Sequence, residues 1–325
     1  MTEAPEPLLK VCDLRVWFPI RKGVLNRIAG QVRAVDGVSF TIFPGETLGL
    51  VGESGCGKTT LGRALMGLEK PAGGRIIFNG QDLGALTGQA RRQLRRHSQM
   101  IFQDPFSSLN PRMTVQELVT EGLVHHRLLQ GRTRTESARE LLASVGMDGD
   151  CLFRYPHEFS GGQRQRISLA RALSLQPHFL VCDEPVSALD VSVQAQVINL
   201  LLDLRERHGL AYLFISHDLS VVRLMSHRVA VMYLGKIVEC GATSDVMETA
   251  HHPYTRALLS AVPRPGKHQD KRIILTGDLP SPAAPPPGCP FHPRCPQALP
   301  VCAQQAPPIR TLDNGHSWAC HITPD

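Results

Sequence analysis

Hydrophobic and polar positions alternate along the first part of the chain and then change their period. Residues 9–52 alternate apolar and polar side chains between turn signals such as "DG" and "PG", which predicts an antiparallel sheet. The apolar run "TLGLVG" at the end of this region predicts a strand, and residues 58–68 repeat their apolar positions with helical spacing. We therefore expect the chain to pass from a strand through a glycine loop into a helix.

Two further apolar runs predict buried strands, "FLVCDEP" at residues 179–185 and "LAYLFIS" at residues 210–216. Strands this apolar are usually covered on both faces, which favours a largely parallel α/β core. Residues 114–175 carry three stripes with helical spacing and predict an all-helical insertion. Two shorter helical patterns follow residue 241, and after residue 280 the composition shifts to proline, cysteine and histidine.

Composition narrows the class of protein. The 325 residues are 42% apolar and 20% charged, which suits one large or two ordinary globular domains. The N-terminus lacks a basic region followed by an apolar run, and 18 uncharged apolar residues never follow one another, so we expect neither export nor a membrane span. A net charge of +6 is too small to demand nucleic acid, and we expect none as a partner. The densest basic cluster, residues 91–97, is expected to cover a solvated helix face.

A phosphate-binding loop is the clearest motif. Residues 52–59, "GESGCGKT", match G-x-x-x-x-G-K-[ST] between a predicted strand and a predicted helix. Glycines let the backbone wrap around an anion, so that N–H groups and the helix N-terminus point at the phosphates. We expect Lys58 to pair with the β and γ phosphates of ATP, and Thr59 to offer its hydroxyl to Mg²⁺. The other nucleotide-binding candidates here are Gly52, Ser54, Gly55, Cys56, Gly57 and Thr60.

Two adjacent carboxylates end the second apolar strand. Open α/β sheets bind ligands at the carboxyl ends of their strands, so a carboxylate there can reach a metal ion at the phosphate loop. We assign Asp183 to Mg²⁺ and Glu184 to polarising the attacking water as general base. His217 follows the third apolar run and is a candidate contact for the γ-phosphate.

Residues 159–166, "FSGGQRQR", lie about 20 residues before the run "VCDEP". Together with the phosphate loop they resemble the nucleotide-binding subunit of ATP-binding-cassette (ABC) transporters, whose signature is L-S-G-G-Q; Phe159 replaces the usual leucine. The resemblance implies that Gln103 in "IFQDP" senses Mg²⁺ and the attacking water, and that His217 is the switch histidine. It also implies that Asp190 ends the loop that crosses a dimer interface.

The resemblance extends to an adenine contact and to a subclass. Phe18 has the spacing of the aromatic residue that stacks on adenine in such subunits, and Trp17 is the competing candidate. The segments "YPHEFSGGQRQRISLARAL" and "HHPYTRALLSAVP" resemble the ATP-binding subunits of oligopeptide and dipeptide importers, a group that includes nickel relatives. An importer of nickel or another small solute, and an ABC ATPase without a transport role, are the alternatives.

The resemblance implies an α/β fold with an ABC-type P-loop NTPase core and an N-terminal antiparallel β subdomain. It also implies an all-helical insertion and a small, irregular, cysteine-rich C-terminal extension. We expect residues 1–103 and 171–245 to form the ATP-binding core, residues 104–170 the helical subdomain with the signature, and residues 246–325 the extension.

The signature predicts a partner subunit. A serine, paired glycines and a helix N-terminus make a second phosphate-binding nest, which cannot fold back onto its own phosphate loop. By resemblance, two subunits sandwich two ATP molecules head to tail, with Ser160, Gly161, Gly162 and Gln163 facing the partner's γ-phosphate. The expected partners are a second ABC ATPase, usually a paralogue, two membrane permeases and, indirectly, an extracytoplasmic solute-binding protein. The expected location is peripheral, on the cytoplasmic face of the membrane.

Four of the nine cysteines, Cys289, Cys295, Cys302 and Cys320, lie close to the end of the chain. Disulfides are rare in a reducing cytosol, so such a cluster predicts a metal site. The spacing lacks the C-x₂-C pairs of structural zinc, and four thiolates suit iron and sulfur equally well. The importer resemblance favours a [4Fe–4S] cluster; zinc and no metal are the alternatives. His292, His316 and His321 are expected to be surface histidines rather than ligands.

Overall fold

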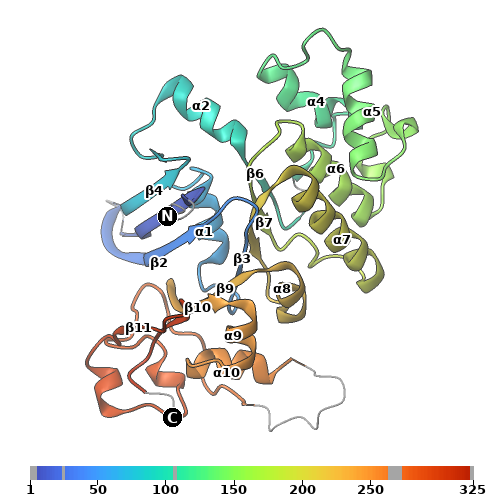
Figure 1. Cartoon of the computed structure of the whole chain (residues 1–325). Helices are drawn as coiled ribbons and strands as arrows, with labels where there is room; N and C mark the ends of the chain where they lie inside the picture. The colour runs from blue at the N-terminus through green and yellow to red at the C-terminus, as the bar shows by residue number, and fades with distance from the viewer. Residues whose placement is uncertain (1–5, 24–25, 105–107, 263–272, 323–325) are drawn as a thin grey trace, which may run out of the picture. The chain divides into compact units, whose positions relative to one another are not determined.

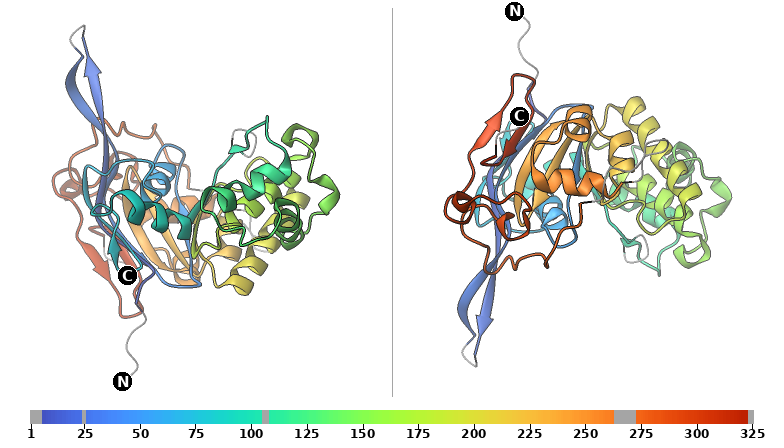
Figure 2. Two further views of the ribbon diagram at one scale, coloured as in Figure 1. Left: turned by 90° about the horizontal axis from the view of Figure 1, so that it is seen from above. Right: turned by 90° about the horizontal axis from the view of Figure 1, so that it is seen from below.

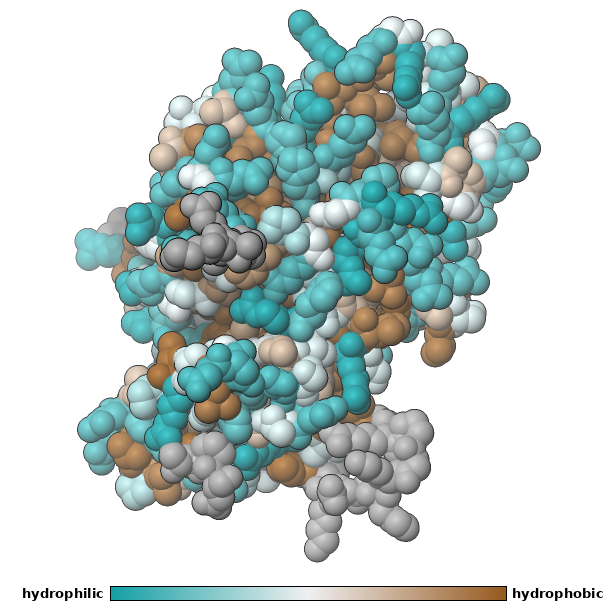
Figure 3. Space-filling view, viewed as in Figure 1, coloured by the Kyte–Doolittle hydropathy of each residue, from teal (hydrophilic) through white to brown (hydrophobic). Residues whose placement is uncertain are grey.

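The computed structural model describes residues 6–23, 26–104, 108–262 and 273–322. Two compact units make up the chain, residues 1–85 with 214–325, and residues 86–213 (Figure 1). None of the helices in the described residues combines the length and apolar content that a bilayer-spanning helix requires. The face of the molecule in Figure 3 is mostly hydrophilic, interrupted by groups of hydrophobic residues.

An antiparallel sheet opens the first unit. Its strand order is β2-β1-β4-β5, and all neighbouring pairs are antiparallel. The bounds are β1 (Leu9–Lys22), β2 (Arg27–Ile42), β4 (Gly73–Phe78) and β5 (Gln81–Asp82). Leu14 and Val16 are buried while Arg15 between them is exposed, which is the alternation that predicted the sheet. The far end of the β1–β2 hairpin projects from the rest of the first unit (Figure 2).

A second sheet in the first unit carries the phosphate loop. β3 (Thr47–Val51) pairs in parallel with β9 (Arg228–Tyr233), and the strand order continues outward as β3-β9-β10-β12-β11. β10 (Lys236–Ala242), β12 (Ser317–Ala319) and β11 (Ile309–Thr311) are antiparallel to their neighbours. The expected parallel pairing therefore holds at β3, whereas the outer edge is antiparallel and built partly from the C-terminal region. Besides α1 (Lys58–Leu65), the part of this unit that the structure describes forms the helices α8 (Leu219–Met225), α9 (Thr243–Glu248) and α10 (Pro253–Ser260).

The second unit combines short parallel strands with helices. β6 (Ser98–Ile101) pairs in parallel with β7 (Phe179–Asp183), which is followed in the strand order by β8 (Ala211–Ile215). The helices in its described residues are α2 (Gly88–His97), α4 (Val115–His125), α5 (Arg134–Ser144), α6 (Gly161–Leu173) and α7 (Val191–His208), with 3₁₀ turns η1 (Gly149–Cys151) and η2 (Pro156–Glu158). Capping boxes begin α4 and α5, where Thr114 and Thr133 pair with a glutamate three residues on.

The C-terminal segment shares a core with the rest of the first unit. Between residues 280 and 308, all of which the structure describes, regular elements are limited to η3 (His292–Arg294) and η4 (Pro300–Ala303). Proline removes backbone donors and accounts for this irregularity. Phe291 is nevertheless fully buried, and its ring centroid lies 5.2 Å from that of Tyr233 and 5.4 Å from that of Tyr254. The segment is thus anchored by aromatic packing on β9 and α10.

Candidate functional site

The phosphate loop runs from the end of β3 to the start of α1. Lys58 is the first residue of α1 and is buried, and its Nζ donates to the carbonyl oxygens of Gly52 at 2.7 Å and Glu53 at 3.0 Å. Gly57 has a φ of 108°, and a Cβ there would lie 2.0 Å from the carbonyl oxygen of Ala34. Only glycine fits this position. The loop therefore wraps around the lysine ammonium at the N-terminus of a helix, as phosphate binding requires.

The other loop residues divide between the interior and the surface. Cys56 is buried, and burial raises the pKa of its thiol, although the ammonium of Lys58 opposes this rise. The side chain is therefore a small neutral packing group at physiological pH. Ser54, Gly55 and Thr59 are exposed, and Thr60 is partly exposed. These exposed positions are the ones from which a bound phosphate can be reached.

The C-terminal region contacts this loop through Glu53, which the sequence analysis did not single out. The main-chain N–H of Glu53 donates to the hydroxyl of Tyr254 at 2.8 Å. Its carboxylate accepts from both terminal nitrogens of Arg294, at 2.6 and 3.0 Å. The partners are 201 and 241 residues away in sequence, so no local pattern signals either contact.

His217 lies in the same unit as the phosphate loop. It follows β8, directly before Asp218, whose carboxylate caps α8 by accepting from the N–H groups of Ser220 and Val221. A pocket of about 430 Å³ brings His217 together with the first glycine of the loop. Its lining consists of Val51, Gly52, His217, Asp218, Leu219, Ser220, Leu258, Ala261 and Val262. The structure therefore places the candidate γ-phosphate contact beside the loop that would hold the phosphates.

The candidate base and its neighbours lie in the second unit. Gln103 Nε2 donates to Glu184 Oε2 at 3.0 Å, at the carboxyl ends of β6 and β7. Asp183 is buried, with 2% of its surface exposed, and Glu184 is partly exposed. Glu184 has a φ of 47°, in the left-handed region that non-glycine residues rarely adopt. Such backbone strain is concentrated at functional sites.

The signature residues form the N-terminus of α6. Ser160 Oγ accepts from the N–H of Gln163 at 3.4 Å, and Gln163 Oε1 accepts from the N–H of Ser160 at 3.0 Å. This reciprocal capping box leaves the positive end of a 13-residue helix at the surface, where Ser160 is exposed. Asp190 caps the neighbouring α7 by accepting from the N–H of Val193 at 3.0 Å, and this bond lowers the pKa of its carboxyl group.

Gly161 and Gly162 are required for packing between α6 and α7. A Cβ on Gly162 would lie 2.3 Å from a methyl carbon of Val193, and one on Gly161 would lie 3.2 Å from Leu189 Cδ2. A side chain at Gly162 would therefore push the two helix N-termini apart. The paired glycines of the motif therefore allow the N-termini of α6 and α7 to lie close together.

Phe18 and Trp17 differ in what covers them. Phe18 lies on β1 with 37% of its surface exposed. Trp17 is partly buried, and the guanidinium carbon of Arg33 lies 5.3 Å from its ring centroid. One face of Trp17 is therefore already occupied by a cation, whereas the ring of Phe18 is accessible for stacking.

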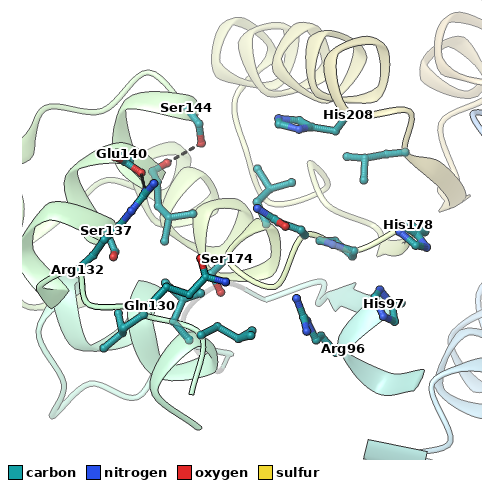
Figure 4. Close-up of a pocket in the computed structure, with 18 residues that line it drawn as sticks. Arg96, His97, Gln130, Arg132, Ser137, Glu140, Ser144, Ser174, His178 and His208 are labelled. Atoms are coloured by element: carbon teal, nitrogen blue, oxygen red, sulfur yellow. Dashed lines mark hydrogen bonds and ion pairs between the residues drawn. The ribbon is translucent and has the colours of Figure 1, made fainter. Parts of the chain in front are cut away.

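A second pocket, of about 600 Å³, lies within the second unit (Figure 4). Arg132 forms an ion pair with Glu140 at 2.6 Å there, and the rings of His97 and His178 are stacked with centroids 4.7 Å apart. Burial lowers the pKa of His97. The basic cluster at residues 91–97 was expected on a solvated face; its first arginines are exposed, but Arg96 and His97 are partly buried and line this pocket.

The four C-terminal cysteines do not form a site for a single metal ion. Within the described parts of the chain, no group of three or more histidine, cysteine, aspartate or glutamate side chains is close enough together to hold one. The structure gives the predicted metal site no support, and zinc bound by all four thiols does not fit. The four residues are free thiols; Cys289, Cys302 and Cys320 are buried and Cys295 is partly exposed.

One of the three histidines expected at the surface is buried instead. His316 has 1% of its surface exposed, and its Nε2 lies 2.8 Å from Glu239 Oε1. Glu239 also accepts from the main-chain N–H groups of His251 at 2.7 Å and His252 at 3.0 Å. The expectation was wrong because a buried carboxylate on β10 requires donors, and His316 supplies one of them. His292 and His321 are partly exposed.

Two family models match the chain. Residues 35–187 match the model described as ABC transporter, and residues 238–302 match the oligopeptide/dipeptide transporter C-terminal region. The "Oligopeptide transport ATP-binding protein AppF" of Bacillus subtilis is 53% identical over 321 residues, which are 98% of each chain. The chain belongs to the oligopeptide/dipeptide group of ABC transporter ATP-binding proteins. This membership confirms the resemblance inferred from the motifs.

Other relatives and solved structures agree with this ABC family. The "Putative oligopeptide transport ATP-binding protein YkfD" of Bacillus subtilis is 51% identical, covering 97% of this chain and 95% of the relative. The structure of cbiO1 from Clostridium perfringens, part of the ABC transporter complex cbiONQ, matches with a TM-score of 0.64 and 26% identity. The match covers 75% of this chain and 92% of cbiO1. The dimeric, post-hydrolysis structure of the ATP-binding cassette MJ0796 bound to ADP and Pi matches with a TM-score of 0.63 and 25% identity. The match covers 72% of this chain and 98% of MJ0796.

The predicted site residues of this ABC subunit are divided between its two units. The phosphate loop and His217 belong to the first, and Gln103, Asp183, Glu184 and the signature belong to the second. The matched ABC transporter region includes the loop, Gln103, the signature and both carboxylates, whereas His217 lies beyond it. The matched C-terminal region includes three of the four clustered cysteines and ends before Cys320.

Proposed function

We propose that this chain is the ATP-hydrolysing subunit that powers import of oligopeptides or dipeptides through an ABC transporter. The main support for ATP hydrolysis is the hydrogen bond between Gln103 and Glu184, because it holds a candidate base at the carboxyl end of a buried strand. The match to the oligopeptide/dipeptide C-terminal region and the names of the relatives support the peptide cargo.

The first part of the proposed mechanism is nucleotide binding. The main-chain N–H groups of the phosphate loop, the α1 N-terminus and Lys58 bind the phosphates of ATP, and Phe18 stacks on adenine. Gly52, Gly55 and Gly57 allow the close approach of the backbone to the phosphates. Ser54, Cys56 and Thr60 are the other proposed contacts. Thr59, Asp183 and Gln103 would hold Mg²⁺; a hydroxyl, a buried carboxylate and an amide are hard oxygen ligands that suit this ion. When bound, Mg²⁺ neutralises phosphate charge.

The second part is hydrolysis. Gln103 orients the carboxylate of Glu184, which takes a proton from the attacking water. The water oxygen forms a bond to the γ-phosphorus, the bond to the bridging oxygen breaks, and ADP and phosphate are the products. His217 donates a hydrogen bond to the γ-phosphate and stabilises the charge that it carries. These roles are supported by the position of all three residues just past the carboxyl ends of β6, β7 and β8.

The third part requires a second subunit. The capped N-terminus of α6, with Ser160, Gly161, Gly162 and Gln163, would face the γ-phosphate bound by a partner in a head-to-tail dimer. Asp190 would lie at this interface, and the next residue, Val191, is 84% exposed, which suits a surface that a partner covers. The dimeric state of MJ0796 supports this arrangement. We propose a paralogue as the partner.

The same proposal places the chain on the cytoplasmic face of a membrane as a peripheral subunit. Its partners are two membrane permeases and, indirectly, an extracytoplasmic solute-binding protein. The ATP-binding core comprises residues 1–103 and 171–245, the helical subdomain residues 104–170 and the extension residues 246–325. Dimer closure on ATP and reopening after hydrolysis would drive the permeases between their two states.

For the extension, we propose a [4Fe–4S] cluster bound by the four clustered cysteines. The main-chain N–H of Cys289 donates to the carbonyl oxygen of Cys302 at 2.8 Å, which joins the first and third thiols. Burial, together with the nearby thiols of Cys295, Cys302 and Cys320, raises the pKa of Cys289 to about 11. The thiols therefore share one region, although no three metal-binding side chains of the described residues form a site for a single ion. A four-iron cluster is larger than one ion. When bound, the cluster would hold the proline-rich segment together.

Reconstitution with the permeases tests the function. The chain, its paralogue, the permeases and the binding protein are placed in vesicles, and uptake of a labelled oligopeptide is measured with and without ATP. We expect ATP-dependent uptake that is lost with Lys58→Ala and kept with the surface control Lys70→Ala. ATP-dependent uptake of nickel without peptide would contradict the cargo, and failure to associate with any permease would contradict the transport role.

A further inference from the structure

Glu53 connects the phosphate loop to the C-terminal extension through its main-chain N–H and its carboxylate. Its N–H donates to Tyr254, its carbonyl oxygen accepts from Lys58 Nζ, and its carboxylate accepts two hydrogen bonds from Arg294. The first and third contacts come from residues of the extension. Tyr254 and Arg294 of the extension therefore hold Glu53, whose carbonyl oxygen in turn positions the ammonium of Lys58.

Arg294 is rigidly placed for this contact. It ends η3 within the segment between Cys289 and Cys295, the same segment that packs Phe291 against Tyr233 and Tyr254. Its side chain is 8% exposed, against 29% for the side chain of Glu53. A guanidinium that binds one carboxylate through two nitrogens fixes the orientation of that carboxylate and neutralises its charge. A lysine ammonium can neutralise the charge but cannot make this two-point contact.

The ion pair with Arg294 neutralises a negative charge inside the phosphate loop, the carboxylate of Glu53. ATP is a polyanion, and a carboxylate within the phosphate loop would repel it. An unpaired Glu53 would also compete with the phosphates for Lys58, whose Nζ already lies 3.0 Å from the main-chain oxygen of Glu53. Arg294 neutralises the carboxylate and binds both of its oxygens.

We propose that Arg294 is a positioning residue for ATP, through which the C-terminal extension sets the affinity of the phosphate loop for polyphosphates. Arg294 acts through Glu53 and does not touch the nucleotide. This inference rests on the proposed ATP binding. It gives the extension a role in the nucleotide cycle of the same chain.

Nucleotide affinity in a double-mutant cycle tests the proposal. Equilibrium dissociation constants for MgATP, MgADP and AMP are measured on the full-length chain and on Arg294→Ala, Glu53→Gln and the double variant. Arg294→Ala should raise the Kd for MgATP about tenfold or more, the scale of one like-charge interaction near a protein surface. AMP lacks the β and γ phosphates, so its affinity should change little.

The double variant separates charge neutralisation from folding. With Glu53→Gln present, no carboxylate is left unpaired, so the double variant should bind MgATP within about threefold of the parent chain. A Kd for MgATP unchanged by Arg294→Ala would overturn the proposal. So would a double variant as impaired as Arg294→Ala, because Arg294 would then serve only to fold the extension. If the parent chain itself bound no ATP, the proposed function would fail instead.

Discussion

Gln103 and Glu184 are 81 residues apart in sequence and share a 3.0 Å hydrogen bond between amide Nε2 and carboxylate Oε2. The register of two parallel strands produces this contact, since Ile101 at the end of β6 pairs with Cys182 near the end of β7. Both side chains then follow the carboxyl ends of neighbouring strands. A water held by the amide would lie against the carboxylate that accepts its proton.

Replacement of Glu184 by glutamine should stop turnover without preventing ATP binding. Glutamine keeps the size of the side chain but cannot accept the proton, so kcat should fall by about 10²–10⁴-fold, the usual contribution of a general base. Steady-state hydrolysis and equilibrium ATP binding measure the two effects. Glu206→Gln, at an exposed position of α7, is the matched control. Turnover within tenfold of the parent would remove Glu184 as the base.

Much of this site could be predicted from the sequence because its motifs are short and local. The phosphate loop needs only a strand, glycines and a helix start, and the Ser160–Gln163 capping box lies within one helical turn. Only the family resemblance indicated a role for Gln103, and its contact with Glu184 was not predicted. Spacing alone cannot give the strand register that brings two side chains 81 residues apart together.

The buried carboxylate of Glu239 should stabilise the extension. His316→Ala removes one of the hydrogen bonds to this carboxylate, and a lost bond to a charged group costs roughly 1.5–3 kcal/mol. Urea unfolding measures the change in the free energy of unfolding. His316→Gln, which can still donate, should recover part of the loss, and the partly exposed His321→Ala serves as control. Equal stability of His316→Ala and the parent would contradict this role for the histidine.

His252 should make the protein less stable as the pH falls. It is buried, caps α10 by accepting from the N–H of Tyr254 at 3.1 Å, and burial lowers its pKa from 6.5 to about 4. Because the folded state binds the proton more weakly, the unfolded chain gains protons first below about pH 6.5. The free energy of unfolding should therefore be unaffected by this residue above pH 6.5 and fall between pH 6.5 and 4, by about 2 kcal/mol at pH 5.

His252→Asn isolates this contribution. Asparagine is a good N-cap without a titrating group, so the difference in unfolding free energy between parent and variant should change with pH over this window. Urea unfolding at pH 7.5 and pH 5 gives the comparison and cancels the titration of other groups. If the difference in unfolding free energy is the same at both pH values, folding does not lower the pKa of His252, and the prediction is wrong.

The clustered cysteines should give coloured protein when it is purified without oxygen. A [4Fe–4S] cluster predicts iron and sulfide in equal amounts and broad visible absorbance, lost with Cys302→Ser. Cys151→Ser, at a buried cysteine of the second unit, is the control and should keep the colour. Colourless protein without bound iron in the parent chain would contradict the cluster.

The extension was the least predictable part of the chain. Proline content indicated irregular structure, but it gave no sign that Phe291 completes an aromatic core or that Arg294 reaches Glu53. Both contacts join residues far apart in sequence, and neither has a periodic signal. His316 was misassigned for the same reason, because its buried partner Glu239 lies 77 residues away.

The dependence of ATP turnover on chain concentration tests the central claim most directly. If the signature of a neighbouring subunit completes each site, the rate per chain should rise with concentration, in the presence of an equimolar amount of the partner subunit, until the dimer saturates. Ser160→Arg, which blocks the exposed N-terminus of α6, should abolish this rise. A full rate that is independent of concentration, and unchanged by Ser160→Arg, would contradict the account.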